Sequence, residues 1–105
     1  MKLSETQVQF YHDNGYLLLE NLFSSEEVNS MLSEMNRVVT EDSPRRILEK
    51  NGSVRSFFAP EQSNELFRDV VRLERLVTPA EQLVNSRVYI HQTKLNSKHA
   101  LLGDW

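Results

Sequence analysis

The amino-acid sequence predicts an α+β fold, and three observations carry the prediction. Two segments near the N-terminus start with capping residues and continue with apolar residues at helical spacing. Asn51-Gly52 separates two β-prone runs, which is the strongest short-range signal for a hairpin. The chain has 105 residues, a length that suits one domain and not two. We therefore expect residues 1–105 to form a single domain with the order helix, strand, helix, hairpin, helix, helix, strand.

The first helix is expected to begin after Ser4 and to end at Asn14-Gly15. Ser4 can cap the helix, and Gln7 stands three residues later, in the spacing of a capping box. Gly15 ends the helix because glycine adopts the left-handed C-terminal conformation at little cost. The apolar run at 16–19 then predicts a short buried strand.

The strongest helix signal covers residues 25–40. Ser24 is a good N-cap, Glu27 occupies the third helical position, and Phe23 can pack on Val28 as a hydrophobic staple. Apolar residues recur along one face of the expected helix, at Val28, Met31, Leu32, Met35, Val38 and Val39. This periodicity predicts an amphipathic helix of about four turns.

The middle of the chain predicts a hairpin followed by two helices. The runs 46–50 and 53–58 flank Asn51-Gly52, and a two-residue turn of this kind needs positive φ at both residues. A helix is expected to begin at Ser63. Thr78-Pro79 indicate the start of another short helix, with threonine as N-cap and proline at the first helical position.

The last expected strand, at 88–96, has one face that begins apolar and becomes polar. Alternation places Gln92, Lys94 and Asn96 together on that face. A strand that runs from a packed core into a ligand cavity would show this gradient, and so would a strand that leaves the core and becomes solvated. Because most polar strand positions face water, spacing alone favours the solvated strand.

Composition argues against several classes of function. The net charge is −3, with acidic and basic residues interspersed, which argues against nucleic-acid binding. No apolar run approaches the roughly 20 residues that span a bilayer, and the N-terminus has no signal-peptide core. Without cysteine there is no disulfide, thiol nucleophile or zinc–thiolate site. We therefore expect a cytoplasmic protein that binds neither nucleic acid nor a membrane.

The sequence contains no recognisable catalytic or metal motif. None of His12, His91 and His99 has an acid two residues later, the spacing with which many 2-His-1-carboxylate iron sites begin. No serine stands in a Gly-x-Ser-x-Gly elbow. Arg55 shares strand parity with Phe57, so it could reach a carboxylate or remain at the surface. We therefore name no catalytic residue and no metal ligand.

Three stretches, in order and spacing, resemble the phytanoyl-CoA dioxygenase family, most closely its ectoine hydroxylase-like members. They are residues 10–28, residues 54–59 and residues 88–96. The resemblance implies the N-terminal helices and first strands of a double-stranded β-helix, a jelly-roll-like barrel that is incomplete here. It also implies an oxidoreductase, a non-haem Fe(II)- and 2-oxoglutarate-dependent dioxygenase that hydroxylates a small-molecule substrate.

The resemblance implies roles for five residues. Gln92 matches a position that contacts the substrate, and Lys98 matches a lysine that contacts 2-oxoglutarate. Arg55 falls where some members place a basic cosubstrate contact, and Thr93 and Asn96 lie beside the cosubstrate. One wall of a cosubstrate cavity would then consist of Gln92, Asn96 and Lys98. The His-x-Asp motif, the distal histidine and the arginine that clamps the far carboxylate are absent from the sequence.

Three readings of the chain follow. We expect an N-terminal fragment of such an oxygenase, which by itself neither turns over nor holds Fe(II) and 2-oxoglutarate tightly. The alternative is a small non-catalytic α+β module that kept this scaffold and binds a partner or a small anion, and a third reading is a remnant without function. Exposed strand edges and an unpaired barrel face predict self-association or poor solubility.

Overall fold

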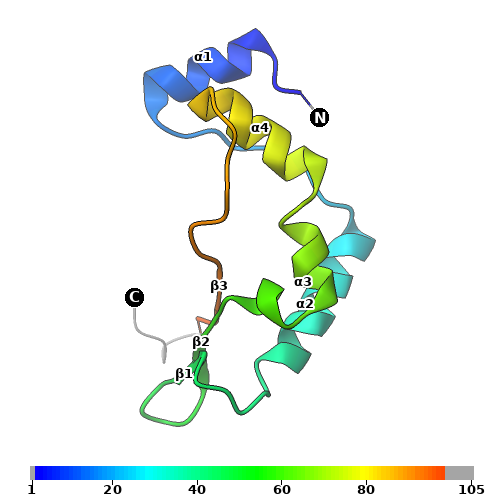
Figure 1. The fold of residues 1–105 in the computed structure, drawn as a ribbon, viewed down its shortest axis with the longest axis vertical. Helices are drawn as coiled ribbons and strands as arrows, with labels where there is room; N and C mark the ends of the chain where they lie inside the picture. The colour runs from blue at the N-terminus through cyan, green and yellow to red at the C-terminus, as the bar shows by residue number, and fades with distance from the viewer. Residues whose placement is uncertain (1, 99–105) are drawn as a thin grey trace.

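The computed structural model describes residues 2–98, and the predicted α+β class is confirmed. Figure 1 shows α1 and α4 at one end of the molecule, α2 and α3 along one side, and the sheet at the other end. No helix within the described range is long and apolar enough to cross a membrane. The elements are α1 (Glu5–Asn14), α2 (Ser25–Val38), β1 (Arg46–Leu48), β2 (Val54–Phe58), η1 (Pro60–Gln62), α3 (Glu65–Val70), α4 (Glu74–Val84) and β3 (Lys94–Asn96).

The starts of α1 and α2 are as predicted, because local hydrogen bonds define both. The Gln7 N–H donates to Ser4 Oγ at 3.1 Å, and the Ser4 N–H donates to Gln7 Oε1 at 2.9 Å. Ser24 and Glu27 form the same reciprocal pair, at 3.1 and 2.8 Å. Gly15 ends α1 with φ 82°, the left-handed conformation expected of a glycine cap.

The predicted hairpin is confirmed, but its turn differs from the prediction. Strands β1, β2 and β3 form an antiparallel sheet in that order. Of the two turn residues only Gly52 has positive φ, at 88°. The Gly52 N–H donates to the Glu49 carbonyl at 2.9 Å, and the Glu49 N–H donates to the Ser53 carbonyl at 2.7 Å. The connection is therefore a three-residue loop with glycine in the left-handed position, another common hairpin solution.

The strand expected at 16–19 is wrong. These residues form no regular element, and the side chains of Tyr16 and Leu18 are 61% and 71% exposed. An apolar run indicates burial but cannot supply the neighbouring strand that its N–H and C=O groups need. The described sheet consists of β1, β2 and β3 only, so none of its strands pairs with residues 16–19.

The helix restart expected at Thr78-Pro79 is also wrong. Helix α4 begins at Glu74, after an extended Leu73, and continues through Pro79 to Val84. Proline removes the hydrogen bond that its N–H would donate to the Arg75 carbonyl. The helix tolerates that single loss because it is held by tertiary packing: Pro79 is buried, and α4 packs beside α1. Asn85 caps the end of α4 in a left-handed conformation, with φ 51°. Helix α3 begins at Glu65, two residues later than expected, with Asn64 as its N-cap.

Only the last third of the expected strand 88–96 is a strand, β3. The Ala59 N–H donates to the Thr93 carbonyl at 3.0 Å, and this is where pairing with β2 stops. Ala59 then adopts a left-handed conformation, φ 52°, and turns the partner chain into η1. Residues 88–92 therefore have no strand to pair with and form an extended connection from α4 to β3 (Figure 1).

The core joins one face of the sheet to the helices α2 and α3. Phe57 and Val38 are fully buried and Phe67 is nearly so. Four partly buried side chains pack around them, those of Met35, Val39, Leu66 and Leu95. The Arg45 guanidinium lies 5.2 Å from the centre of the Phe57 ring, so a cation also contacts the core.

The molecule is more open than a compact domain of its length. The Cα radius of gyration is 16.1 Å, whereas a compact domain of this size has about 13 Å. Many large apolar side chains are exposed, among them those of Leu18, Leu32, Ile47, Leu48, Phe58, Val84, Val88, Tyr89 and Ile90. Residues 2–98 thus leave many large apolar side chains uncovered.

Adjacent phenylalanines in β2 test this one-sided packing. Phe57→Ala should destabilise the chain by about 3–5 kcal/mol, the usual effect of removing a buried aromatic ring. Phe58→Ala should cost much less, because that ring is 37% exposed on the other face of the sheet. Urea denaturation followed by circular dichroism measures both variants. Equal losses would contradict the assignment of the core to one face.

Candidate functional site

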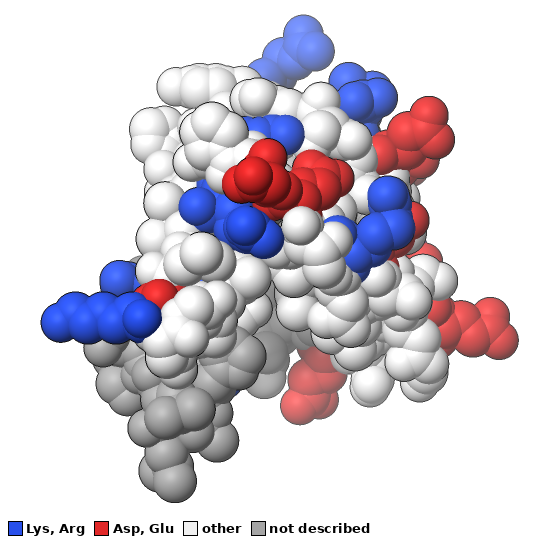
Figure 2. Space-filling model, turned by 90° about the horizontal axis from the view of Figure 1, so that it is seen from below, with Lys and Arg blue, Asp and Glu red and all other residues white. Residues whose placement is uncertain are grey.

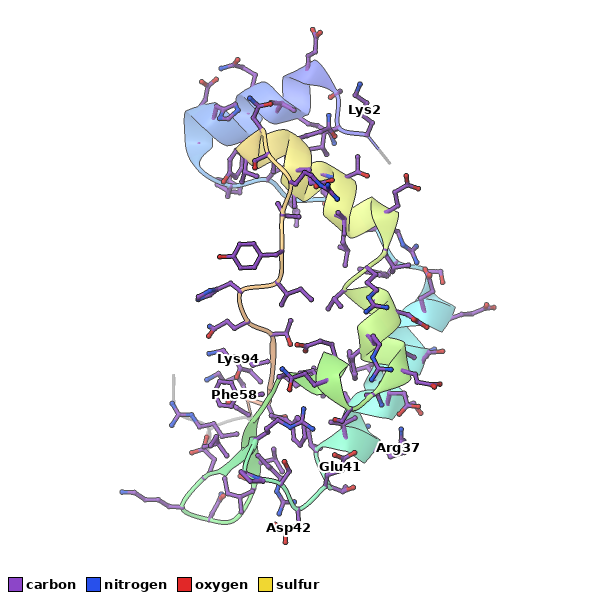
Figure 3. The ribbon with its side chains drawn as sticks, in the orientation of Figure 1. Lys2, Arg37, Glu41, Asp42, Phe58 and Lys94 are labelled. Carbon is purple, nitrogen blue, oxygen red and sulfur yellow. The ribbon has the colours of Figure 1, made fainter. Side chains whose placement is uncertain are left out.

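The candidate site lies on the face of the sheet that points away from α2 and α3. Strand register pairs Ser56 with Asn96 and Phe57 with Leu95. Because Phe57 and Leu95 belong to the core, alternation places their neighbours on the opposite side. We call this side the open face, and it comprises Ile47, Ser56, Phe58, Lys94 and Asn96. Figure 3 shows Phe58 and Lys94 beside each other on neighbouring strands.

A hydrogen bond between two side chains links β2 and β3 on the open face. The Ser56 Oγ–H donates to Asn96 Oδ1 at 2.8 Å. Ser56 is 7% exposed and Asn96 is exposed. Within residues 2–98 the Asn96 Nδ2 group has no hydrogen-bond partner. The hydrogen bond therefore occupies the amide oxygen of Asn96, Oδ1, and leaves its Nδ2 group available.

The five residues predicted from the family resemblance are not all brought together. Asn96 lies on the open face, and Lys98 follows it two residues later. Backbone pairing with β2 continues past Asn96, since the Ser97 N–H donates to the Arg55 carbonyl at 2.9 Å. Gln92 is exposed in the connection before β3. Arg55 alternates with the core residue Phe57 and so belongs to the opposite face.

Thr93 is engaged on the side of η1. Its Oγ1–H donates to the Glu61 carboxylate, and its carbonyl accepts the last ladder bond from Ala59. This contact anchors the end of the connection to the residue after Pro60. Sequence reasoning missed Glu61, and no spacing rule links two residues so far apart in the chain.

Ser56 is the other residue that sequence reasoning missed. The available signal was a single hydroxyl within the otherwise apolar and basic strand Val54–Phe58. A buried hydroxyl needs a partner, but the sequence does not say which strand supplies it.

The described residues do not supply a metal site. No group of three His, Cys, Asp or Glu side chains that could hold an ion occurs within residues 2–98. His12 stands at the end of α1, with its ring 5.6 Å from that of Tyr11. His91 is exposed in the connection, and His99 lies outside the described residues. The donors of an Fe(II) site are thus not found in this range.

A groove in the described part lies elsewhere, between α2 and α3. Its volume is about 610 Å³. Apolar side chains, including those of Met31, Leu66 and Val70, line the groove, and acidic ones, Glu26, Glu34, Glu65 and Asp69, surround them. Negative charge makes this groove unsuited to a dicarboxylate. At the sheet end of the molecule, Figure 2 shows Lys and Arg interspersed with Asp and Glu.

An ion pair fixes α2 against the start of α4 at one end of this groove. The Arg75 guanidinium donates to both carboxylate oxygens of Glu27 and, at 3.1 Å, to the Leu22 carbonyl. It also lies 4.8 Å from the centre of the Phe23 ring. The hydrogen bond from Arg75, followed by the backbone N–H of Ser24, lowers the pKa of Glu27 to about 2. The Glu27 carboxylate therefore has a structural role, which is to link α2 to α4.

The sequence matches the phytanoyl-CoA dioxygenase (PhyH) family over residues 11–104. It is 39% identical to the ectoine dioxygenase of Bordetella bronchiseptica, over 96% of this chain and 34% of that protein. It is 35% identical to the ectoine dioxygenase of Streptomyces anulatus, over 87% of this chain and 32% of that protein. The chain thus spans about a third of the length of the curated relatives it matches.

Solved structures agree with the sequence comparison. The fold superposes on EctD from S. alaskensis with bound Fe, with a TM-score of 0.83 and 26% identity, over 90% of this chain and 35% of that one. The same coverage holds for EctD from S. alaskensis with 2-oxoglutarate and 5-hydroxyectoine, with a TM-score of 0.82. The helices and the three-stranded sheet therefore have the arrangement of one third of those structures.

The pKa of Glu27 predicts how stability depends on pH. A carboxylate whose pKa is lowered on folding stabilises the fold above its ordinary pKa, here 4.5, and this contribution is lost as pH falls toward about 2. Glu27→Gln should therefore lower the melting temperature at pH 6 and leave a shallower decline between pH 4.5 and 2. Circular dichroism melts from pH 2 to 7 measure this dependence.

Glu26→Gln is the matched control, because Glu26 is the adjacent acid in the first turn of α2. Its melting temperature should follow the unsubstituted chain across the same range. If Glu26→Gln showed the same shallow decline as Glu27→Gln, overall charge, rather than the pair with Arg75, would cause the loss of stability at low pH.

Proposed function

The chain belongs to the phytanoyl-CoA dioxygenase family, and we propose that it is the N-terminal part of a Fe(II)- and 2-oxoglutarate-dependent dioxygenase domain that hydroxylates a small molecule. One observation carries the proposal. The chain superposes over 90% of its length on EctD from S. alaskensis but covers only 35% of that structure. By analogy with the relatives' printed name, ectoine or a related small molecule is the candidate substrate.

The exposed apolar surface supports a role as part of a larger domain. The sheet has three strands, and its order leaves β1 and β3 at the edges. Its open face carries Ile47 and Phe58, both more than one third exposed. We propose that further strands of the domain extend this sheet into a double-stranded β-helix and cover these side chains. Burial of such surface is the main favourable term in folding.

The open face supplies the proposed contacts with the cosubstrate. A carboxylate needs cations and N–H donors in a site sheltered from water. Asn96 offers an N–H donor, and Lys98 follows it with a positive charge, so both fit a carboxylate of 2-oxoglutarate. Gln92, in the connection above them, is the proposed substrate contact. Roles for Thr93 and Arg55 stay predictions from the family resemblance, since neither lies on the open face.

The chain's own contribution is therefore binding and orientation. When bound, Fe(II) and 2-oxoglutarate would supply the oxidising chemistry. Because residues 2–98 hold no set of metal donors, we propose that the 105-residue chain alone does not turn over. We also propose that it associates with itself through the edges of β1 and β3, which carry unpaired N–H and C=O groups.

A non-catalytic interaction or ligand-binding module is the second candidate. The α2–α3 groove favours it, since this groove of about 610 Å³ is built from residues that the open face does not use. Such a module would fold and stay dispersed without further strands. The two candidates therefore differ in what they predict for the isolated chain.

Anaerobic titration of the 105-residue chain with Fe(II) and 2-oxoglutarate tests the proposed division of labour. We expect no micromolar binding of either, because the chain supplies only part of one wall of the site. Isothermal calorimetry measures the affinity. Micromolar binding of both would contradict the proposal that the rest of the domain supplies the metal donors.

Sedimentation velocity over a hundredfold range of concentration separates the two candidates. A piece of a larger domain should associate increasingly with concentration, because its sheet edges and apolar face are uncovered. Phe58→Lys should reduce that association, while Tyr89→Lys, at an exposed position remote from the sheet, should not. A dispersed monomer at every concentration would instead favour the module.

A further inference from the structure

Ser56 and Asn96 form a cross-strand pair whose contact is set by tertiary structure. They stand directly opposite each other in β2 and β3, and residues so placed have neighbouring Cβ atoms. Their side chains meet at 2.8 Å although they are 40 residues apart in the chain. The contact lies on the open face, where the proposed function places the cosubstrate.

The hydroxyl of Ser56 decides which way the Asn96 amide points. A serine hydroxyl carries one hydrogen to donate, and an amide offers an acceptor at Oδ1 and a donor at Nδ2. If the amide were turned over, Nδ2 would donate to Oγ and the hydroxyl hydrogen would need another acceptor. Within residues 2–98 the only acceptor bonded by that hydroxyl is Asn96 Oδ1. Since Ser56 is 7% exposed, water is a poor substitute, and the observed orientation is favoured.

The group left over is a donor on a face that also carries Lys94. With Oδ1 held by Ser56, the amide presents Nδ2 to anything bound on the open face. Lys94 lies two residues away on the same face, and Lys98 adds a second cation two residues beyond Asn96. Such a site matches an anionic oxygen acceptor and disfavours a cationic ligand.

We propose that Ser56 is a positioning residue that locks the Asn96 amide with Nδ2 toward the ligand, so that this position recognises a carboxylate oxygen. The inference rests on the proposed function and deepens it, because it assigns the direction of one hydrogen bond to the cosubstrate. Without the hydroxyl, the amide can rotate, and in half of its orientations it would present an acceptor to the carboxylate.

NMR spectroscopy of the 105-residue chain provides the test. The Nδ2 hydrogens of Asn96 give their own signals, which can be followed while 2-oxoglutarate is added up to about 50 mM, far above the micromolar range in which we expect no binding. Sodium chloride at equal ionic strength controls for screening. Ser56→Ala removes the hydroxyl, and Ser56→Thr retains it on a side chain that suits a strand. The backbone signals of Phe57 and Leu95 report that the sheet is intact in each variant.

We expect the Asn96 side-chain signals of the unsubstituted chain and of Ser56→Thr to shift with the same apparent Kd. Ser56→Ala should bind about fivefold more weakly, as expected for one misdirected hydrogen bond. An unchanged Kd in Ser56→Ala would overturn the positioning role and leave the proposed cosubstrate contact intact. If the Asn96 chemical shifts did not change in any variant, the contact itself would be overturned, and with it the proposed role of Asn96.

Discussion

Phe57 is fully buried between the sheet and the helices, and its contacts with Val38 and Phe67 join the two parts of the molecule. The residues on either side of it, Ser56 and Phe58, point the other way because side chains alternate along a strand. One strand thus fixes both the core and the open face. This explains how a molecule with so few buried side chains has a defined orientation of its sheet, and why half of that sheet remains uncovered.

The uncovered face of the sheet carries both apolar and polar side chains. The open face combines the apolar Ile47 and Phe58 with the polar pair Ser56–Asn96. In the larger domain that we propose, further strands would cover the apolar side chains there and would shelter the polar pair from water, where its hydrogen bonds are strongest. The α2–α3 groove differs in kind, because acidic residues line it and the Glu27–Arg75 pair links α2 to α4 at one end.

Much of the local structure could be predicted from the sequence, and one residue of the candidate site was named in advance. The capping boxes at Ser4 and Ser24 were found because each is closed within four residues. The resemblance to a family pointed to Asn96. Ser56 and Glu61 were missed, since each meets its partner only across strands or between η1 and the connection. The strands expected at 16–19 and over 88–93 failed for a related reason, because a strand exists only where another strand pairs with it.

The sequence by itself determined where the helices begin, that a hairpin follows α2, and to which family the chain belongs. Those features depend on neighbours in the chain or on residue order. Tertiary structure alone decided how far β3 extends, that Arg55 and Asn96 occupy opposite faces, and that Ser56 holds the Asn96 amide. The physical reason is the register of β2 with β3: it brings together residues 40 positions apart, and it ends where Ala59 turns the partner strand away.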